Sequence, residues 1–384
     1  MKTAELNENA KLALDTIMMR KTQSIPTGCL HLMDIPLLEE LGGHQRGEYL
    51  KSPEDVYLDC QKSIGVCMID QYIPRNPLTM SQHGFDSSTA RTPTTGLEKI
   101  VIDGVLIDSP EAVVEHLERF VFPSLQKRLQ ELQASSREEM ADNLIQKERD
   151  VQKIFGSDIL KVPYGTGFNN FPMFRYGTYG YENYFMAYAL YPEVMEKDFA
   201  LQADVAEKRN QIAVLAYKKG NLPPLLRLDH DMADSRGTLV NINSLDKIWF
   251  PHFARAIKPY VEAGIKLIWH CDGNLMEMVP RLIEAGISGF QGFQYEAGMD
   301  YEAICRMKDR EGNTLFIWAG VCVTKTLPHG TESDVKRELT WLVEKGPPVG
   351  LLLGASSSIT PGTNPRNIKT LIEGLKYYRT HGRK

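Results

Sequence analysis

Residues 266–274 read Lys-Leu-Ile-Trp-His-Cys-Asp-Gly-Asn, and this stretch decides the fold. Its apolar run, Lys266–Trp269, predicts a buried strand, and Gly273 predicts the turn that follows. A helical pattern begins at once and runs over Leu275–Ala285. The stretch is therefore one strand–helix unit with polar residues at the carboxyl end of its strand.

The polar end of this strand carries three reactive side chains. On an extended backbone His270 and Asp272 face the same side, and Cys271 faces the other. An imidazole and a carboxylate that project together suit a metal site or an acid–base pair. The pattern also fits a hydrogen-bonded loop anchor, and the spacing alone leaves both interpretations open.

The same strand–helix unit recurs on both sides of this stretch. Further strands are predicted at Pro224–Leu228, Gly289–Phe293, Leu315–Trp318 and Gly350–Leu353. Further helices are predicted at Leu245–Ala263, Tyr301–Asp309, Glu332–Glu344 and Pro365–Thr380. Strands that alternate with helices of this length indicate a parallel sheet with right-handed crossovers.

Two earlier strands, Val66–Ile73 and Asp158–Phe168, bring the count close to eight. The first strand is not followed by Gly-x-Gly-x-x-Gly, which argues against a dinucleotide-binding open sheet. We therefore predict an α/β fold of the (β/α)₈ TIM-barrel type. We expect one domain over residues 1–384, in which residues 1–65 form an N-terminal extension packed on the barrel.

The first third of the chain is less regular. Apolar spacing predicts a helix at Glu5–Arg20, and Ser52 followed by Pro53 predicts the start of a helix that runs to Lys62. The polar stretch Ser81–Thr95 is predicted to be loop. Alternating residues around Asp103-Gly104 predict a hairpin over Glu98–Asp108.

Composition excludes several classes of protein. The 384 residues are 42% hydrophobic and 24% charged, with a formal net charge of −5, which is typical of a globular chain with a large core. A mildly acidic chain gives no electrostatic reason to expect nucleic acid. The sequence contains no run of ~18 apolar residues, so no membrane span is predicted. Six scattered cysteines without Cys-x-x-Cys spacing predict reduced thiols and a cytoplasmic protein.

In a barrel the strand ends converge on one mouth. The residues at the predicted strand ends are Asp229, Asp231, His270, Asp272, Gln294, Glu296, Cys322 and Ser356–Ser358. Carboxylate, imidazole and thiolate are all Zn²⁺ ligands, and a catalytic zinc needs three with one position open. The strand ends therefore predict a divalent metal. The alternative is a polar, water-filled mouth whose acidic side chains hydrogen-bond loops.

Several of these residues resemble a known family. The resemblance to the uroporphyrinogen decarboxylase superfamily rests on His270-Cys271-Asp272-Gly273-Asn274, Leu282–Gly286, Gly320, Gly330, Ile359-Thr360-Pro361 and Asn364–Ile368. It is good from about residue 224 onward, thinner over 158–200 and weak before 120. The family fold is a (β/α)₈ barrel, which agrees with the strand count.

The superfamily has a decarboxylase branch and a branch of corrinoid-dependent methyltransferases. Decarboxylases resemble one another in an Arg-rich N-terminal segment, whereas residues 20–60 hold only Arg20 and Arg46. Thiol-methylating members carry His-x-Cys and a later Cys as zinc ligands. Here His270 matches the His, Asp272 stands in the place of the first Cys, and Ser356–Ser358 stand where the later Cys falls. The resemblance therefore favours the substrate-side methyltransferases of the O-demethylase type.

This resemblance implies an enzyme that moves a methyl group from a small methoxylated compound, expected to be aromatic, to Co(I) of a corrinoid carried by a partner protein. Expected metal ligands, with Zn²⁺ as the metal, are His270, Asp272, Glu296 and Cys322. Expected catalytic residues are Asp229, Asp231, His270 and Glu296. Expected substrate contacts are Tyr164, Tyr176, Tyr179, Gln294 and Ser357. The alternatives are a decarboxylase of a carboxylated ring compound and a methylcorrinoid:thiol methyltransferase. A homodimer is possible within this family.

Overall fold

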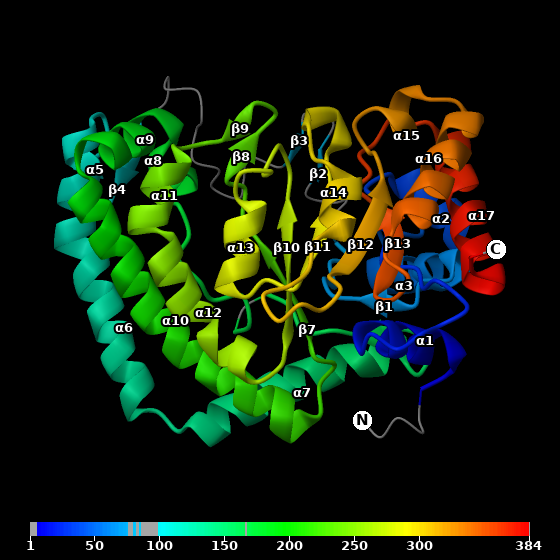
Figure 1. Ribbon diagram of the computed structural model, residues 1–384, viewed down its shortest axis with the longest axis horizontal. Coiled ribbons are helices and arrows are strands. Elements are labelled where there is room, and N and C mark those ends of the chain that lie inside the picture. The colour runs from blue at the N-terminus through cyan, green and yellow to red at the C-terminus, as the bar shows by residue number, and fades with distance from the viewer. Residues whose placement is uncertain (1–5, 76–79, 82–83, 86–98, 166, 384) are drawn as a thin grey trace.

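The largest sheet in the computed structural model is built by the regular part of the chain (Figure 1). Its five strands run parallel in the order β13-β12-β11-β10-β7. Their bounds are β7 (Leu225–Asp229), β10 (Lys266–Cys271), β11 (Gly289–Gly292), β12 (Phe316–Val321) and β13 (Leu351–Ala355). All five strands predicted in this part are confirmed. The structure describes residues 6–75, 99–165 and 167–383, and residues 80–81 and 84–85 by their backbone alone; the side chain of Cys271 is likewise not described.

Three further stretches of chain extend this sheet into a barrel. Strand β1 (Met68–Ile69) pairs in parallel with β6 (Leu160–Lys161). Thr27 forms a parallel bridge to Leu353 of β13, and Gly28 forms one to Met68 of β1. The ring of eight thus runs β7-β10-β11-β12-β13, then Thr27–Gly28, then β1 and β6. Among the described residues no ladder joins β6 back to β7, so we call this junction the seam. The predicted (β/α)₈ barrel is confirmed.

The N-terminal residues contribute more than an outer layer. Residues 1–65, expected as an extension, include the Thr27–Gly28 stretch that completes the ring. Around this stretch lie α1 (Glu8–Ile17), α2 (Ile35–Gly42) and α3 (Pro53–Ile64). The predicted helices at Glu5–Arg20 and Ser52–Lys62 correspond to α1 and α3. The segment between them pairs with the sheet through single bridges, which leave no alternating pattern in the sequence.

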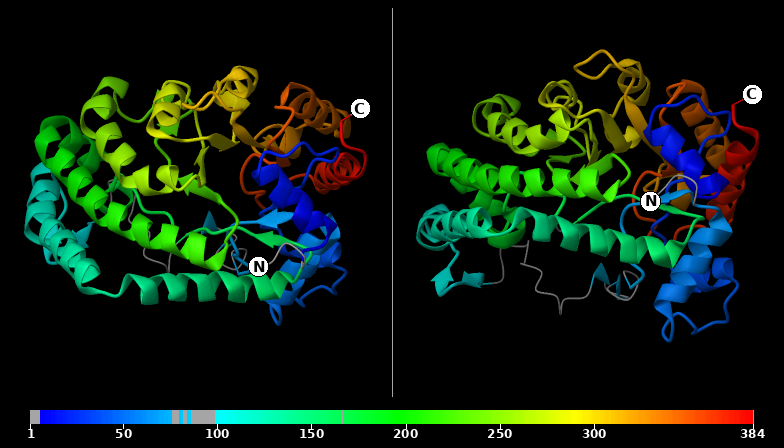
Figure 2. Two further views of the ribbon diagram at one scale, coloured as in Figure 1. Left: turned by 60° about the horizontal axis from the view of Figure 1, so that its bottom comes forward. Right: turned by 90° about the horizontal axis from the view of Figure 1, so that it is seen from below.

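Helices surround the ring (Figures 1 and 2). Those on the N-terminal side are α5 (Pro110–His116), the π-helix η2 (Leu117–Val121), α6 (Phe122–Ala134), α7 (Arg137–Phe155), α8 (Tyr176–Tyr179), α9 (Tyr181–Leu190) and α10 (Pro192–Gly220). Those of the regular part are α11 (Ile242–Ile248), α12 (Phe250–Glu262), α13 (Val279–Ala285), the 3₁₀ helix η3 (Tyr295–Ala297), α14 (Tyr301–Arg306), α15 (Thr326–His329), α16 (Glu332–Lys345) and α17 (Pro365–His381).

The predicted helix Leu245–Ala263 is two helices. Helix α11 ends and α12 begins at Trp249, whose φ and ψ are −118° and −54°. Pro251, two residues later, has no N–H to donate to the Lys247 carbonyl, so the helical hydrogen-bond ladder is interrupted there. The single long helix was therefore a wrong prediction.

Short two-stranded hairpins lie outside the barrel sheet. Strands β4 (Val101–Ile102) and β5 (Val105–Leu106) pair antiparallel about Asp103 and Gly104, as predicted. Both turn residues have positive φ, 49° and 79°, as a two-residue type I′ turn requires. The loop predicted at Ser81–Thr95 lies mostly outside the described residues, although β2 (Met80–Ser81) pairs with β3 (Gly84–Phe85). Strands β8 (Ala233–Asp234) and β9 (Gly237–Thr238) form one more hairpin.

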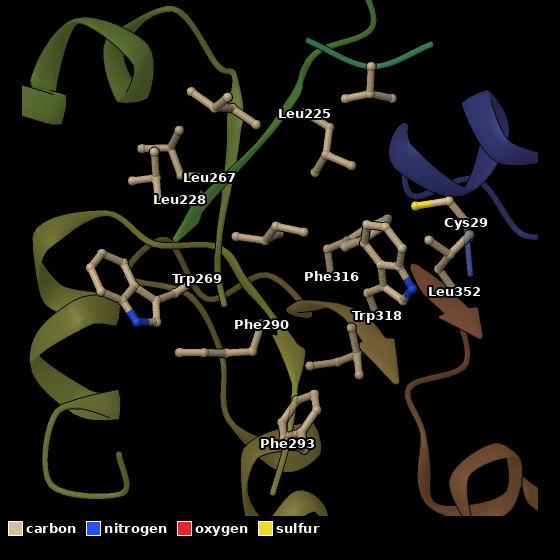
Figure 3. Packing of buried hydrophobic residues seen from close by; sticks show 14 of the residues in the cluster. Cys29, Leu225, Leu228, Leu267, Trp269, Phe290, Phe293, Phe316, Trp318 and Leu352 are labelled. Carbon is tan, nitrogen blue, oxygen red and sulfur yellow. The ribbon is translucent and has the colours of Figure 1, made fainter. Parts of the chain in front are cut away.

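Alternate residues of the strands point into the ring or out to the helices. Trp269 of β10 points outward, with its ring 6.2 Å from that of Trp249 and 5.5 Å from that of Phe253. Trp318 of β12 points inward, toward the strand that carries Cys29 (Figure 3). A Cβ on Gly28 would lie 2.4 Å from the Trp318 ring. Only glycine therefore lets Thr27–Gly28 approach β13 and β1 this closely.

None of the described helices is both long enough and apolar enough to cross a bilayer.

Candidate functional site

A small cavity of about 70 Å³ lies at the carboxyl ends of the strands, inside the ring. We call it the mouth cavity. It is lined by Cys29, His31, Gln71, Arg227, Asp229, His270, Gln291, Trp318, Ala355, Ser357 and Ser358. These residues come from strands on both sides of the ring, as expected for the active end of a barrel.

Two of the lining residues, Cys29 and His31, form a cluster of three metal-ligating side chains with Asp70, which lies behind them. The Cys29 thiol lies 3.6 Å from His31 Nε2 and 3.7 Å from Asp70 Oδ1. The three ligand atoms all lie within 4.8 Å of one another, and no other such group of three was found among the described residues. One sulfur, one nitrogen and one oxygen, with space on the cavity side, match a catalytic zinc site.

Local contacts explain why Cys29 and His31 face the same side. They stand two residues apart on extended backbone, and Leu30 between them points the other way. The side-chain amide of Gln61, from α3, accepts from Leu30 N at 3.4 Å and donates to Leu30 O at 2.9 Å. The Gln61 amide thus satisfies the two backbone groups of Leu30 that a neighbouring strand would otherwise pair. Ile359 N donates to the His31 carbonyl at 2.9 Å, which fixes the other side.

Burial controls the charge states of this cluster. It raises the pKa of the Cys29 thiol, so the proton leaves only when a cation takes its place. Desolvation lowers the pKa of His31 to about 4, which keeps the ring neutral and able to bind a metal. Burial acts to raise the pKa of Asp70, but the Arg227 guanidinium outweighs it and holds this pKa at about 2.

Arg227 of β7 links the cluster to the opposite wall. Its Nε lies 2.6 Å from Asp70 Oδ2, and its Nη1 lies 3.0 Å from Asp229 Oδ2. Tyr164 donates to the same Asp229 oxygen at 3.2 Å, and the guanidinium lies 4.6 Å from the centre of its ring. Arg227 is only 6% exposed. The buried cation is therefore balanced by two carboxylates and covered by an aromatic face.

Polar atoms without partners also surround the cavity. His270 Nδ1, Gln291 Oε1, His31 Nδ1 and Trp318 Nε1 are buried and have no hydrogen-bond partner in the described structure. A Cβ on Gly292 would lie 3.1 Å from His270 Nδ1, so glycine at this position leaves room for the His270 ring. Buried polar groups are nearly always satisfied in folded proteins. These four atoms belong to residues that line one cavity, so they are available to hydrogen-bond a bound ligand.

Asp231 and Asp272 lie nearby but do not line the cavity. Asp231 is exposed, and its carbonyl accepts from Tyr176 at 3.0 Å. Partial desolvation and the charges of Asp272 and Asp229 raise the pKa of the Asp231 carboxyl. Asp272 accepts from Gln294 Nε2 at 3.1 Å, and Gln294 Oε1 accepts from Gly273 N at 2.8 Å. Gln294 thus ties together the loops after β10 and β11.

Glu296 and Cys322 belong to a separate hydrogen-bonded group. Thr324 donates to Glu296, and the Thr324 hydroxyl lies 3.3 Å from Cys322 Sγ. The Cys322 amide donates to Glu338 at 2.7 Å. Of the four ligands expected from the sequence, only His270 lines the mouth cavity, and the four form no single cluster of donors.

The expected substrate residues are also spread out. Ser357 lines the mouth cavity, and Tyr164 contacts it through Asp229. Tyr176 stacks on His230, with ring centres 5.8 Å apart. Tyr179 is fully buried, and its hydroxyl contacts His116 Nδ1 at 2.9 Å. In this structure Tyr179 is a core residue.

Sequence reasoning missed Cys29, His31, Asp70 and Arg227. One signal was present, because Cys29 and His31 have the same two-residue spacing as His270 and Asp272. It was missed because their strand is defined by two bridges rather than by an apolar run. Arg227 lay inside a correctly predicted strand, but its partner Asp70 is 157 residues away in sequence.

Comparison with known proteins supports the fold. No family model matches the chain, and neither does any curated protein. The structure resembles a methyltransferase from Methanosarcina mazei, with a TM-score of 0.55 and 14% identity over 96% of this chain and 98% of that one. It also overlaps 62% of this chain with 65% of a B12-independent methionine synthase from Shewanella sp. W3-18-1, at 13% identity and a TM-score of only 0.40. At this level of identity the first likeness establishes a shared barrel architecture.

Proposed function

We propose that this barrel is a methyltransferase that moves a methyl group from a small O-methylated donor to the Co(I) centre of a corrinoid protein. The observation that carries the proposal is the Cys29, His31 and Asp70 cluster beside the mouth cavity. The family resemblance around His270–Asn274 supports a corrinoid as the acceptor, and the methyltransferase likeness in fold is consistent with it.

The cluster fits a Zn²⁺ ion. Cys29, His31 and Asp70 would supply three ligands of the types that zinc prefers, and a substrate in the cavity could supply the fourth. When bound, the ion supplies a Lewis acid that makes the donor oxygen a better leaving group. Arg227 has a positioning role, because it holds the Asp70 carboxylate from the side away from the cluster.

The remaining residues of the wall orient the donor and handle its proton. In the transfer the methyl carbon gains its bond to cobalt from the Co(I) electron pair, while the C–O electron pair stays on the leaving oxygen. That oxygen needs a proton, and His270 on the cavity wall is the proposed donor. Asp229, held by Arg227 and Tyr164, keeps the negative charge of the wall fixed.

The size of the mouth cavity restricts what enters it. A volume of about 70 Å³ is well below the ~300–1,000 Å³ of pockets that enclose a whole small molecule. The methoxy end of a donor fits this space, whereas an aromatic ring would remain outside it. Tyr176 lies on that outer side through its contact with Asp231, so we keep it as a candidate contact for the ring.

A decarboxylase is the second candidate, because Arg227 is a cation on the cavity wall that a substrate carboxylate would recognise. Two carboxylates already hold its guanidinium, and this favours methyl transfer.

The test combines the purified protein with cob(I)alamin and a panel of methoxyaromatics, methylamines and methanol. The cobalt absorption spectrum should show methylcobalamin with one class of donor. Chelation should abolish transfer, and added Zn²⁺ should restore it. Replacement of Cys305, a thiol away from the cavity, should change nothing.

Each outcome tests a different part of the proposal. If no donor in the panel methylates cobalt, the methyl-transfer function is wrong. If carbon dioxide is released from a carboxylated ring compound instead, the decarboxylase is correct. If transfer proceeds unchanged after chelation has removed all metal, the Lewis-acid role is wrong although methyl transfer stands.

A further inference from the structure

A second cavity, of about 330 Å³, opens at the other end of the barrel strands. It lies between α1, α7, the start of β6 and the segment at residues 220–224 that leads into β7. In Figure 1 this region is at the bottom, near the N-terminus, while the β8–β9 hairpin of the mouth is at the top. We call it the seam cavity, because β6 and β7 border the barrel's unpaired junction.

Apolar side chains form most of the wall of the seam cavity. Leu14 and Met18 reach it from α1, Leu160 from β6, and Leu222 from the segment before β7. Met18 is 45% exposed and adds apolar surface at the opening of the cavity. A volume of about 330 Å³ is at the lower end of the ~300–1,000 Å³ range of pockets that bind small molecules.

Cations outnumber anions in the same wall. Arg20, Arg149 and Lys161 line the cavity, against the single carboxylate of Glu148. Lys161 is buried and donates to Glu148 at 2.7 Å and to the Val162 carbonyl at 2.5 Å. Its charge is therefore already balanced within the wall.

The remaining positive charge is on the rim. Arg20 pairs with Asp15 at 2.6 Å. Arg149 is exposed and forms no ion pair among the described residues. An apolar wall is here combined with a guanidinium that forms no ion pair among the described residues. Such a wall is complementary to a molecule with an apolar body and one negative charge.

We propose that the seam cavity binds a small amphipathic anion, with its apolar body against Leu14, Leu160 and Leu222 and its carboxylate against Arg149. The site is separate from the mouth cavity, with which it shares no lining residue. The proposal is therefore independent of the proposed methyl transfer and of any bound metal.

Calorimetric titration of the full chain with octanoate tests this site. We expect saturable binding of one octanoate per chain, with octanol, its neutral counterpart, at least about tenfold weaker. Arg149→Glu should weaken octanoate about tenfold, because the rim charge changes sign. The matched control Arg137→Glu makes the same change on an exposed residue of the same helix, α7, and should leave the affinity unchanged.

A second variant tests the apolar wall. Leu14→Trp should fill the cavity and abolish octanoate binding, with thermal unfolding used to verify that it folds. If octanoate shows no saturable binding at millimolar concentration, the proposal is wrong. It is equally wrong if Arg149→Glu binds octanoate as tightly as the Arg137→Glu control, or if octanol binds as tightly as octanoate.

Discussion

The two sides of the mouth cavity are held in place in different ways. Asp229 and His270 sit at the ends of strands in a continuous five-stranded ladder. Cys29 and His31 follow a stretch that joins the ring through two single bridges. The ladder positions its side chains by backbone alone, whereas the bridged side depends on side-chain contacts. The geometry of the candidate metal ligands therefore depends on a few contacts that cross the ring.

The strongest of these contacts is the Asp70–Arg227 ion pair. Both groups are buried, at 2% and 6% exposure, so removal of Asp70 leaves the buried Arg227 guanidinium with Asp229 as its one remaining carboxylate partner among the described residues. Asp70→Ala should lower the free energy of unfolding by about 3–5 kcal/mol, measured by urea denaturation. Replacing both residues, as Asp70→Leu with Arg227→Met, should recover much of this loss.

The control for this prediction is an ion pair within the regular part. Asp246 pairs with Arg281 at 2.5 Å, and both are partly exposed. Asp246→Ala should cost at most about 1 kcal/mol. If Asp70→Ala costs no more than that, the two sides of the cavity are not coupled through Arg227.

The two sides also differ in how well their strands can be predicted from the sequence. Strands β7 and β10–β13 are four to six residues long, which is enough for an apolar run to stand out. Strands β1 and β6 have two residues each, so the strands predicted at Val66–Ile73 and Asp158–Phe168 were placed correctly but made too long. The Thr27–Gly28 stretch has too little pattern to be recognised.

For the same reason the candidate site was predicted only on one side. Asp229, His270 and Ser357 were identified because they follow recognisable strands. The distant partners Asp70 and Arg227 meet only when the ring forms, and no local pattern encodes such a meeting. Residues such as Cys322 follow a strand equally well, but local hydrogen bonds take them away from the cavity.

The next largest expected effect is the loss of zinc affinity when a metal ligand is removed. If it binds on the bridged side, Cys29→Ala should weaken zinc binding by about 100-fold or more, beyond the ~10–100-fold that loss of an outer contact costs. Cys322→Ala, the corresponding thiol on the ladder side, should leave it unchanged. Zinc content per chain and competition with a chelating dye measure both. The opposite result would place the metal on the ladder side with His270.

Another contact between the two sides predicts sensitivity to acid. His230 Nε2 accepts from Phe174 N at 2.9 Å, and only an unprotonated Nε2 can accept this bond. Desolvation lowers the pKa of His230 to about 4, although Asp229 opposes the shift. An unfolded histidine has a pKa of ~6.5, so between about pH 6.5 and 4 the unfolded chain binds a proton that the folded chain does not.

The stability that His230 contributes is therefore complete above about pH 6.5 and is lost as the pH falls toward 4. We expect a loss of about 1–2 kcal/mol across this range, measured by urea denaturation at each pH. His230→Phe should reduce the slope of this part of the profile, to which His31 also contributes, while His381→Gln, in an exposed helix end, should not. A profile unchanged by His230→Phe would show that another group controls the acid response.

The smallest expected effect concerns Tyr164, which donates to Asp229 from the bridged side at 3.2 Å. Tyr164→Phe removes this hydrogen bond but keeps the ring against Arg227, so it should cost about 0.5–1.5 kcal/mol. Tyr191→Phe, which removes an exposed hydrogen bond to Glu111, is the matched control and should cost less. Because Arg227 still holds Asp229, zinc affinity should not change. A loss of zinc affinity in Tyr164→Phe would mean that the ladder side also positions the metal ligands, and the division between the two sides would then be incorrect.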